Sequence, residues 1–281
     1  MKSVATLFVL CAISQAADPV VSPWITPKPG TPAGKTQPAK VASRIYARDR
    51  AVWVYTPPAF DPARKQPYNL LVAFDGADYT TEIPLPTILD NLLAAGKVAP
   101  TIAILVENGA GAERLGDLAN RAQFASFLSG ELVPWARQNW NVTHDPARTI
   151  VTGSSAGGLA AAYAAFKYPA VFGNVLAQSG AFWRGNEASN DAPYEWLASQ
   201  FKQSPKLPVT FWLEVGAGET APVLRGAGPV FLEANRRFRD VLLAKGYTVE
   251  YHEIPGAQHE PGHWRNQIAD GILWLTARRK P

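Results

Sequence analysis

The sequence contains almost no cysteine. Its 281 residues include one, Cys11, and that residue lies near the N-terminus. A single cysteine excludes an intramolecular disulfide, and loss of the N-terminal segment would also exclude a thiol nucleophile and a zinc site built from cysteines. The protein must therefore be stabilised by its apolar core, and a chain of this length with 47% hydrophobic residues can form one.

Long hydrophobic runs are also absent. The apolar residues 4–13 follow Lys2 and precede the small residues Ser14 and Ala16. This arrangement is typical of a secretory signal peptide, whereas a helix that spans a membrane needs about 20 apolar residues. We therefore predict a signal peptide over residues 1–16 and a secreted or periplasmic protein that does not span the membrane.

Clusters of basic residues are missing as well. The net charge is +4 and the pI about 9.1, but no long run of lysine or arginine occurs. Nucleic acids are therefore not expected as partners.

Prolines are concentrated near the start of the chain. Residues 17–40 contain six of the 24 prolines, with lysine and threonine between them. We predict that residues 17–40 form a flexible arm and that residues 41–281 form one folded domain.

Short apolar runs alternate along the chain with segments whose apolar residues have helical spacing. Predicted strands cover residues 50–55, 69–74, 101–106, 149–152, 174–178, 209–215 and 248–254. Predicted helices cover residues 86–95, 123–139, 156–167, 230–245 and 264–276. This alternation indicates an α/β fold with a mostly parallel sheet and helices on both faces. The polar and aromatic segment 184–208 is expected to be a loop that caps the mouth of a site.

The segment TIVTGSSAGGLAAAYAAF places a turn rich in glycine and serine between a predicted strand and a predicted helix. The pattern G-x-S-x-G fits only with Gly153, Ser155 and Gly157 at its fixed positions, because a frame centred on Ser154 would need glycines where threonine and alanine stand. Such a turn presents its serine as a nucleophile, and the glycines leave room for the strained backbone. The start of the next helix favours negative charge, so the N–H of Ala156 is a predicted oxyanion donor.

A serine nucleophile requires a histidine base. Three histidines follow Ser155: His252 within a predicted strand, and His259 and His263 in the loop after that strand. Loops at the carboxyl ends of parallel strands form the sites of such sheets, so we favour His259 as the base and keep His263 as the alternative.

The carboxylate that orients the base is expected from the segment FWLEVGAGET. This segment offers Glu214 within a predicted strand and Glu219 in the loop beyond it. We favour Glu219, because a side chain in that loop can turn toward a histidine.

No metal or other cofactor is expected. Residues 259–263 match the zinc-protease pattern H-E-x-x-H in spacing, but that pattern needs a helix, and Pro261 and Gly262 disfavour one there.

Further site residues are expected beside the predicted strand ends. A second oxyanion donor is predicted in the loop after residues 69–74, from the N–H of Gly76 or Ala77. Candidate substrate contacts are aromatic and cationic: Phe182, Trp183, Trp196, Arg114 and Arg184. The aromatic rings fit core packing equally well.

Several of these motifs together resemble a known family. The strand–GSSAGG–helix block, its continuation to FGNVLAQSGAFW, and the segments LEVGAGE and GAQHEPGHW resemble the secreted and periplasmic esterases of the esterase D and enterochelin esterase group. The similarity extends from about Val41 to the C-terminus. The run RLGDL at residues 114–118 resembles the R-x-x-E-L motif of that group, with Asp117 in place of glutamate.

The resemblance implies an α/β-hydrolase fold and the hydrolysis of carboxylic esters. It also implies Ser155 as nucleophile, Glu219 as acid, His259 as base and Trp264 as the aromatic residue of the site.

The favoured hypothesis is a secreted serine carboxylesterase of the siderophore (enterochelin) type that acts through an acyl-enzyme. The alternative is an esterase of the feruloyl or acetyl-xylan type that acts on plant polymers. Two other classes are less favoured: an acyltransferase similar to the mycolyl transferases, and a binding protein without catalysis.

Overall fold

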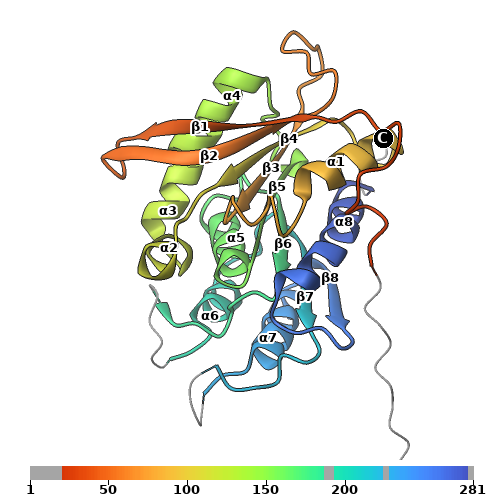
Figure 1. The fold of residues 1–281 in the computed structure, drawn as a ribbon. Coiled ribbons are helices and arrows are strands. Elements are labelled where there is room, and N and C mark those ends of the chain that lie inside the picture. The colour runs from red at the N-terminus through yellow and green to blue at the C-terminus, as the bar shows by residue number, and fades with distance from the viewer. Residues whose placement is uncertain (1–20, 187–192, 224–227, 278–281) are drawn as a thin grey trace, which may run out of the picture.

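Eight strands of the described chain form one sheet, in the order β1-β2-β4-β3-β5-β6-β7-β8 (Figure 1). The computed structural model describes residues 21–186, 193–223 and 228–277; the predicted signal peptide lies outside them. The strands are β1 (Lys35–Ser43), β2 (Arg48–Thr56), β3 (Asn69–Phe74), β4 (Thr101–Val106), β5 (Thr149–Ser154), β6 (Asn174–Gln178), β7 (Thr210–Gly216) and β8 (Thr248–Ile254). The pairs β1–β2 and β2–β4 are antiparallel, and all other neighbours are parallel. The predicted mostly parallel sheet is confirmed.

Helices cover both faces of this sheet (Figure 1). They are α1 (Leu85–Ala94), α2 (Gly111–Leu118), α3 (Ala122–Phe127), α4 (Val133–Trp140), α5 (Ala156–Lys167), α6 (Trp196–Gln203), α7 (Phe231–Ala244) and α8 (Pro261–Ala277). One apolar core packs helices α1 and α8 against one face of the sheet. A second core packs the five helices from α3 through α7 against the other face. The central strands are buried on both faces, which explains their continuous apolar runs.

The described part of residues 17–40 is not a free arm. Its end belongs to β1, which pairs with β2 along its whole length. Before β1, the Asn91 side chain of α1 donates hydrogen bonds to the carbonyls of Trp24 (2.8 Å) and Thr26 (2.9 Å). The expected boundary at residue 41 is therefore wrong. An edge strand tolerates Pro38, because the N–H that proline lacks is needed only on the paired side of the strand.

The single helix predicted over residues 123–139 is divided. A π-helical segment, Leu128–Leu132, lies between α3 and α4. Pro134 follows it and has no N–H to donate to the carbonyl four residues earlier, so the regular α-helical bonding pattern cannot continue through this point.

Two helices lie where the sequence predicted none. One is α2, and the other is α6, which falls within the loop expected over residues 184–208. Leu197 and Phe201 of α6 are fully buried, and the Phe201 ring packs edge-on against Phe211 and Phe238. The part of the expected cap that forms α6 is therefore packed against the core. No helix in the described ranges is both long and apolar enough to cross a membrane.

Candidate active site

The turn between β5 and α5 holds Ser155 in a strained backbone conformation. Its φ is 56° and its ψ −120°, a region that side chains other than glycine rarely occupy. Gly153 is sterically required, because a Cβ atom there would lie 2.6 Å from the backbone carbonyl carbon of Gly157. At Gly157 a Cβ would meet only ordinary contacts, the nearest at 3.4 Å from Asp75. The two glycines of the motif therefore have unequal roles: Gly153 must lack a side chain so that the turn can close.

Three side chains from distant parts of the chain form a continuous hydrogen-bonded series. The hydroxyl oxygen of Ser155 lies 2.9 Å from Nε2 of His259, and Nδ1 of His259 lies 2.6 Å from Oε2 of Glu219. A carboxylate beside Nδ1 favours the tautomer that carries its proton there, which leaves Nε2 free to accept the serine proton. The structure thus brings together the three residues selected from the sequence.

Glu219 is held from its other side as well. Its Oε1 accepts hydrogen bonds from the Ser179 hydroxyl (2.5 Å) and from the Gly216 N–H (2.9 Å). The residue is 6% exposed, so these donors replace the water that an exposed carboxylate would bind. Both oxygens of the carboxylate are therefore committed.

The alternative acid, Glu214, is not the carboxylate that bonds His259. It is 2% exposed, and its Oε1 accepts a hydrogen bond from the Gln178 side-chain amide at 2.5 Å. Burial, with added repulsion from Glu219 and Asp270, raises the pKa of Glu214 well above its usual value. Burial therefore favours the neutral form of this carboxyl, and a neutral carboxyl cannot stabilise a charged imidazole.

The two remaining histidines after Ser155 have other partners. His263 accepts a hydrogen bond from the Gln258 N–H at Nδ1 (2.6 Å), and its Nε2 lies 3.4 Å from Glu260. His252 pairs with Glu250 on β8 at 3.1 Å. Within the described ranges no group of three or more His, Cys, Asp or Glu side chains is arranged to hold a metal ion.

Two of the aromatic residues expected at the mouth are core residues. Phe182 is fully buried and its ring stacks on Phe238 at 4.0 Å, so its prediction as a substrate contact is wrong. Trp183 is 5% exposed and packs edge-on against Phe231 at 6.2 Å, which leaves little of it for a ligand. Trp196 lies 5.9 Å from the ring of Tyr163.

Two aromatic rings do contact the histidine of the series. The ring of Trp264 meets His259 edge-on at 5.1 Å, and the ring of Phe231 lies 4.2 Å from it. Trp264 is 8% exposed, so its ring packs against His259 from the protein interior and does not form a surface for substrate. Sequence reasoning missed Phe231. Its only signal was its place at the start of a predicted helix, close after the acid loop.

The predicted oxyanion donors have different fates. Ala156 is the first residue of α5, so its N–H has no partner within the helix and lies beside Ser155. The Gly76 N–H donates to the carbonyl of Val106 at 2.9 Å, so Gly76 is wrong as a donor. The Ala77 N–H lies 3.1 Å from the carboxylate of Glu107, and this contact must open before Ala77 can meet an oxyanion. The error at Gly76 arose because β4 extends far enough to pair with this turn.

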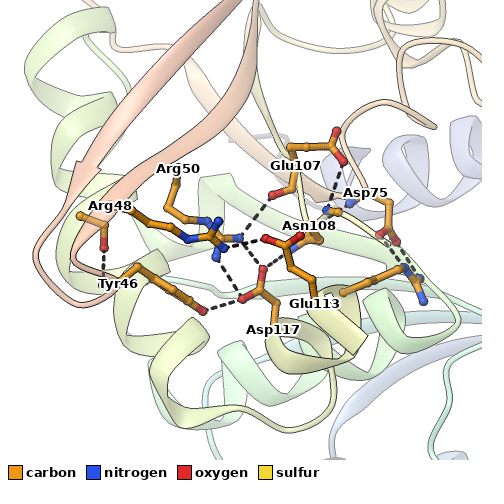
Figure 2. Close-up of polar contacts among 11 residues, drawn as sticks. Tyr46, Arg48, Arg50, Asp75, Glu107, Asn108, Glu113 and Asp117 are labelled. Atoms are coloured by element: carbon orange, nitrogen blue, oxygen red, sulfur yellow. Dashed lines mark hydrogen bonds and ion pairs between the residues drawn. The ribbon is translucent and has the colours of Figure 1, made fainter. Parts of the chain in front are cut away.

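The loop after β3 is fixed by a buried polar network (Figure 2). Asp117 of α2 accepts hydrogen bonds from Tyr46 (2.7 Å), from Nη1 of Arg50 (3.1 Å) and from Asn108 (2.9 Å). Asn108 in turn accepts a hydrogen bond from the N–H of Asp75 at 3.0 Å. Asp75 has a positive φ of 57°, so these contacts hold a strained residue next to the turn that carries Ser155.

Arg114 of α2 binds the same loop through Asp75. Its Nε and Nη2 bind the two oxygens of Asp75 at 2.6 and 2.7 Å, in the bidentate geometry of a strong ion pair. Arg114 lies with Asp75, Ala77 and Glu107 along a cleft of about 300 Å³. Arg114, a predicted substrate contact, therefore lies beside the loop after β3, and its charge is neutralised by Asp75.

We expect Asp117→Asn to lower the free energy of unfolding by about 3–5 kcal/mol, because it leaves the buried Arg50 guanidinium without its counter-charge. Denaturant titration followed by circular dichroism is the measurement. Glu113→Gln is the matched control, since its ion pair with Arg48 is half exposed and is expected to contribute less than about 1 kcal/mol. Equal losses in the two variants would contradict the assignment of the network.

The sheet order, the strained serine between β5 and α5, and the serine–histidine–carboxylate series define an α/β-hydrolase fold. Residues 43–275 match the esterase family model, described as "Putative esterase". The chain belongs to this family, and the resemblance predicted from its motifs is confirmed.

Relatives with known names support the same placement. The chain is 33% identical over 245 residues to the iron(III) enterobactin esterase of Dickeya dadantii (strain 3937), a match that covers 83% of this chain and 53% of that protein. It is 27% identical over 237 residues to the iron(III) salmochelin esterase of Escherichia coli O6:H1, with 81% and 54% covered. The chain thus spans about half the length of these relatives.

Solved structures share the fold. The enterobactin esterase from Shigella flexneri superposes with a TM-score of 0.79 at 24% identity, over 92% of this chain and 63% of that one. A ferulic acid esterase from Anaeromyces mucronatus superposes with a TM-score of 0.74 at 16% identity, over 94% and 99%. The predicted α/β-hydrolase fold is confirmed.

Proposed function

We propose that this protein is a serine carboxylesterase with Ser155 as nucleophile, His259 as general base and Glu219 as the orienting acid. The observation that carries the proposal is the unbroken series from the Ser155 hydroxyl through both nitrogens of His259 to Glu219, with contacts of 2.9 and 2.6 Å. Such a series is the arrangement that activates a serine for acyl transfer.

The first half of the reaction forms an acyl-enzyme. The Ser155 oxygen attacks the ester carbonyl carbon while its proton passes to Nε2 of His259. The imidazolium is stabilised by the Glu219 carboxylate at Nδ1, and the Ala156 N–H stabilises the negative charge that develops on the carbonyl oxygen. His259 then gives its proton to the alcohol oxygen as the carbon–oxygen bond breaks, and the alcohol leaves.

The second half releases the acid. A water molecule gives a proton to Nε2 of His259 and attacks the acyl carbon, and the second tetrahedral species collapses with return of that proton to Ser155. The products are the free acid and the regenerated serine.

For the substrate, we propose a siderophore ester of the enterobactin class. Relatives named as iron(III) enterobactin and iron(III) salmochelin esterases support this class.

A plant-type ester is the second candidate substrate. The observation in its favour is length: the ferulic acid esterase structure is covered over 99% of its chain, whereas the named siderophore esterases are covered over about half.

We also propose that the protein is secreted or periplasmic. Support comes from the sequence alone, in the charged start, short apolar run and small-residue cleavage site of residues 1–16. N-terminal sequencing of the exported protein tests this, and a retained Met1 would contradict it.

Parallel assays of purified protein lacking residues 1–16 test the substrate. We expect kcat/KM for ferric enterobactin to exceed that for methyl ferulate by at least about 100-fold, a difference that corresponds to about 2.7 kcal/mol in the transition state. Product formation followed by liquid chromatography is the measurement.

The reverse order would favour the plant-type ester. Acyl transfer to an added sugar that outruns hydrolysis would favour a transferase. Binding without turnover of any ester would favour a protein that only binds.

A further inference from the structure

Ser179 lies directly after β6 and contacts Glu219, the acid of the proposed catalytic series. It is 1% exposed and has a φ of 46°, in the left-handed region that favours glycine. Its N–H donates to the backbone carbonyl of Glu214 at 2.8 Å. A buried hydroxyl on a residue with this backbone conformation carries two costs, since glycine would relieve the strain and leave no polar side chain to satisfy.

The hydroxyl of Ser179 has both of its contacts within the site. Its oxygen lies 2.5 Å from Oε1 of Glu219 and 3.0 Å from Nε1 of Trp264. An indole N–H can only donate, so the serine oxygen accepts from Trp264. The one proton of the hydroxyl is therefore directed at Glu219.

Trp264 is itself fixed. Its backbone carbonyl accepts a hydrogen bond from the Gln178 side chain at 2.7 Å, and its ring packs edge-on against His259. The Trp264 ring thus contacts His259, and its N–H donates a hydrogen bond to Ser179. The Ser179 hydroxyl in turn donates to Glu219. The contacts form a closed loop of side chains around the pair of Glu219 and His259.

We propose that Ser179 is a positioning residue for ester hydrolysis: oriented by Trp264, it fixes the Glu219 carboxylate so that Oε2 points at Nδ1 of His259. This inference rests on the proposed function of Glu219 and His259. The Gly216 N–H is the other donor to Oε1, and one donor alone leaves the carboxylate free to rotate about its last side-chain bond. With two donors converging on Oε1, only one orientation satisfies both.

The test compares Ser179→Gly and Ser179→Ala with the unmodified protein. We expect kcat to fall by about 10–100-fold in both, the usual effect of removing a residue that orients a catalytic group, with little change in KM. Because a displaced carboxylate stabilises the charged imidazole less, the acidic limb of the kcat/KM profile is expected to move to lower pH. Trp264→Phe keeps a ring beside His259 and is expected to give a smaller shift in the same direction.

Controls separate positioning from folding. Ser179→Gly relieves the positive φ of the backbone, which offsets part of the loss of the hydrogen bonds to Glu219 and Trp264, so the variant should keep the circular dichroism spectrum of the unmodified protein and a cooperative thermal transition above the assay temperature. Ser199→Ala removes another hydroxyl, one that bonds the Trp196 carbonyl on α6, and should leave kcat and the pH profile unchanged.

The outcomes are distinguishable. If Ser155→Ala is inactive but Ser179→Gly keeps its kcat, or loses kcat with the acidic limb unmoved, the inference about Ser179 is overturned and the proposed series stands. If Ser155→Ala keeps full turnover, the proposed function itself fails.

Discussion

Ser155→Ala is expected to lower the kcat for p-nitrophenyl acetate by about 10⁴–10⁶-fold, because no other group at the turn can form the acyl-enzyme. The hydroxyl is the atom that meets Nε2 of His259 at 2.9 Å, and its loss leaves the rest of the site in place. Initial rates measure the effect. Mass spectrometry after treatment with a fluorophosphonate should show an adduct on Ser155 in the unmodified protein and none in the variant.

Ser154→Ala is the matched control for this experiment. Ser154 is the last residue of β5, is 6% exposed and is the neighbouring hydroxyl in the chain. Because its side chain takes no part in the series, the variant should keep most of its turnover. Loss of activity in Ser154→Ala with activity retained in Ser155→Ala would show that the wrong serine was chosen.

Glu219→Gln is expected to lower kcat by about 10⁴-fold. The amide cannot stabilise the imidazolium, and when it donates to Nδ1 it favours the tautomer with the proton on Nε2, where the serine proton must go. Steady-state kinetics across pH measure the loss, and circular dichroism checks that the variant is folded.

Glu214→Gln provides the contrast, since it changes the same residue type five positions earlier on β7. Because the raised pKa favours the neutral form of Glu214, which an amide mimics, and because Glu214 makes no contact with His259, kcat should stay near that of the unmodified protein. Similar losses in the two variants would contradict the choice of Glu219 as the acid.

Stability against pH supplies a second readout for Glu214→Gln. Below the pKa of glutamate in the unfolded chain, about 4.3, Glu214 is neutral in both states. As the pH rises above that value the unfolded chain ionises while the folded protein does not, so the unmodified protein loses stability and the variant does not. The unfolding free energy of Glu214→Gln relative to the unmodified protein should therefore increase with pH; a constant difference would contradict a neutral Glu214.

The central strands and the glycine-rich turn at Ser155 could be predicted because their causes are local. Residues 69–74 and 101–106 are continuous apolar runs, and only a strand buried on both faces of a sheet suits such short runs between turns. The spacing of Gly153 and Ser155 likewise reflects a contact within five residues of chain. The prediction failed where local signals conflicted: β1 contains Pro38 and follows a proline-rich segment, but an edge strand accommodates a proline.

The roles of the aromatic residues could not be predicted, because a buried ring and a ring that lines a pocket have the same local sequence. Phe182 follows the strand β6 as a mouth residue would, but helix α7 covers it through Phe238. Phe231 had no signal of its own, and only the path of the loop before α7 places it 4.2 Å from His259.

The sequence by itself determined the alternation of the central strands with helices, the frame that selects Ser155, and the family, because each of these depends on residue types at short, regular spacing. Only the tertiary structure decided the contacts that span long separations. His259 lies 104 residues from Ser155 and 40 from Glu219, and Ser179 lies 40 residues before the acid that it holds. Such contacts depend on which strand ends meet at one edge of the sheet and on how each loop turns there, and hydrogen-bond geometry is met only when several loops are packed together.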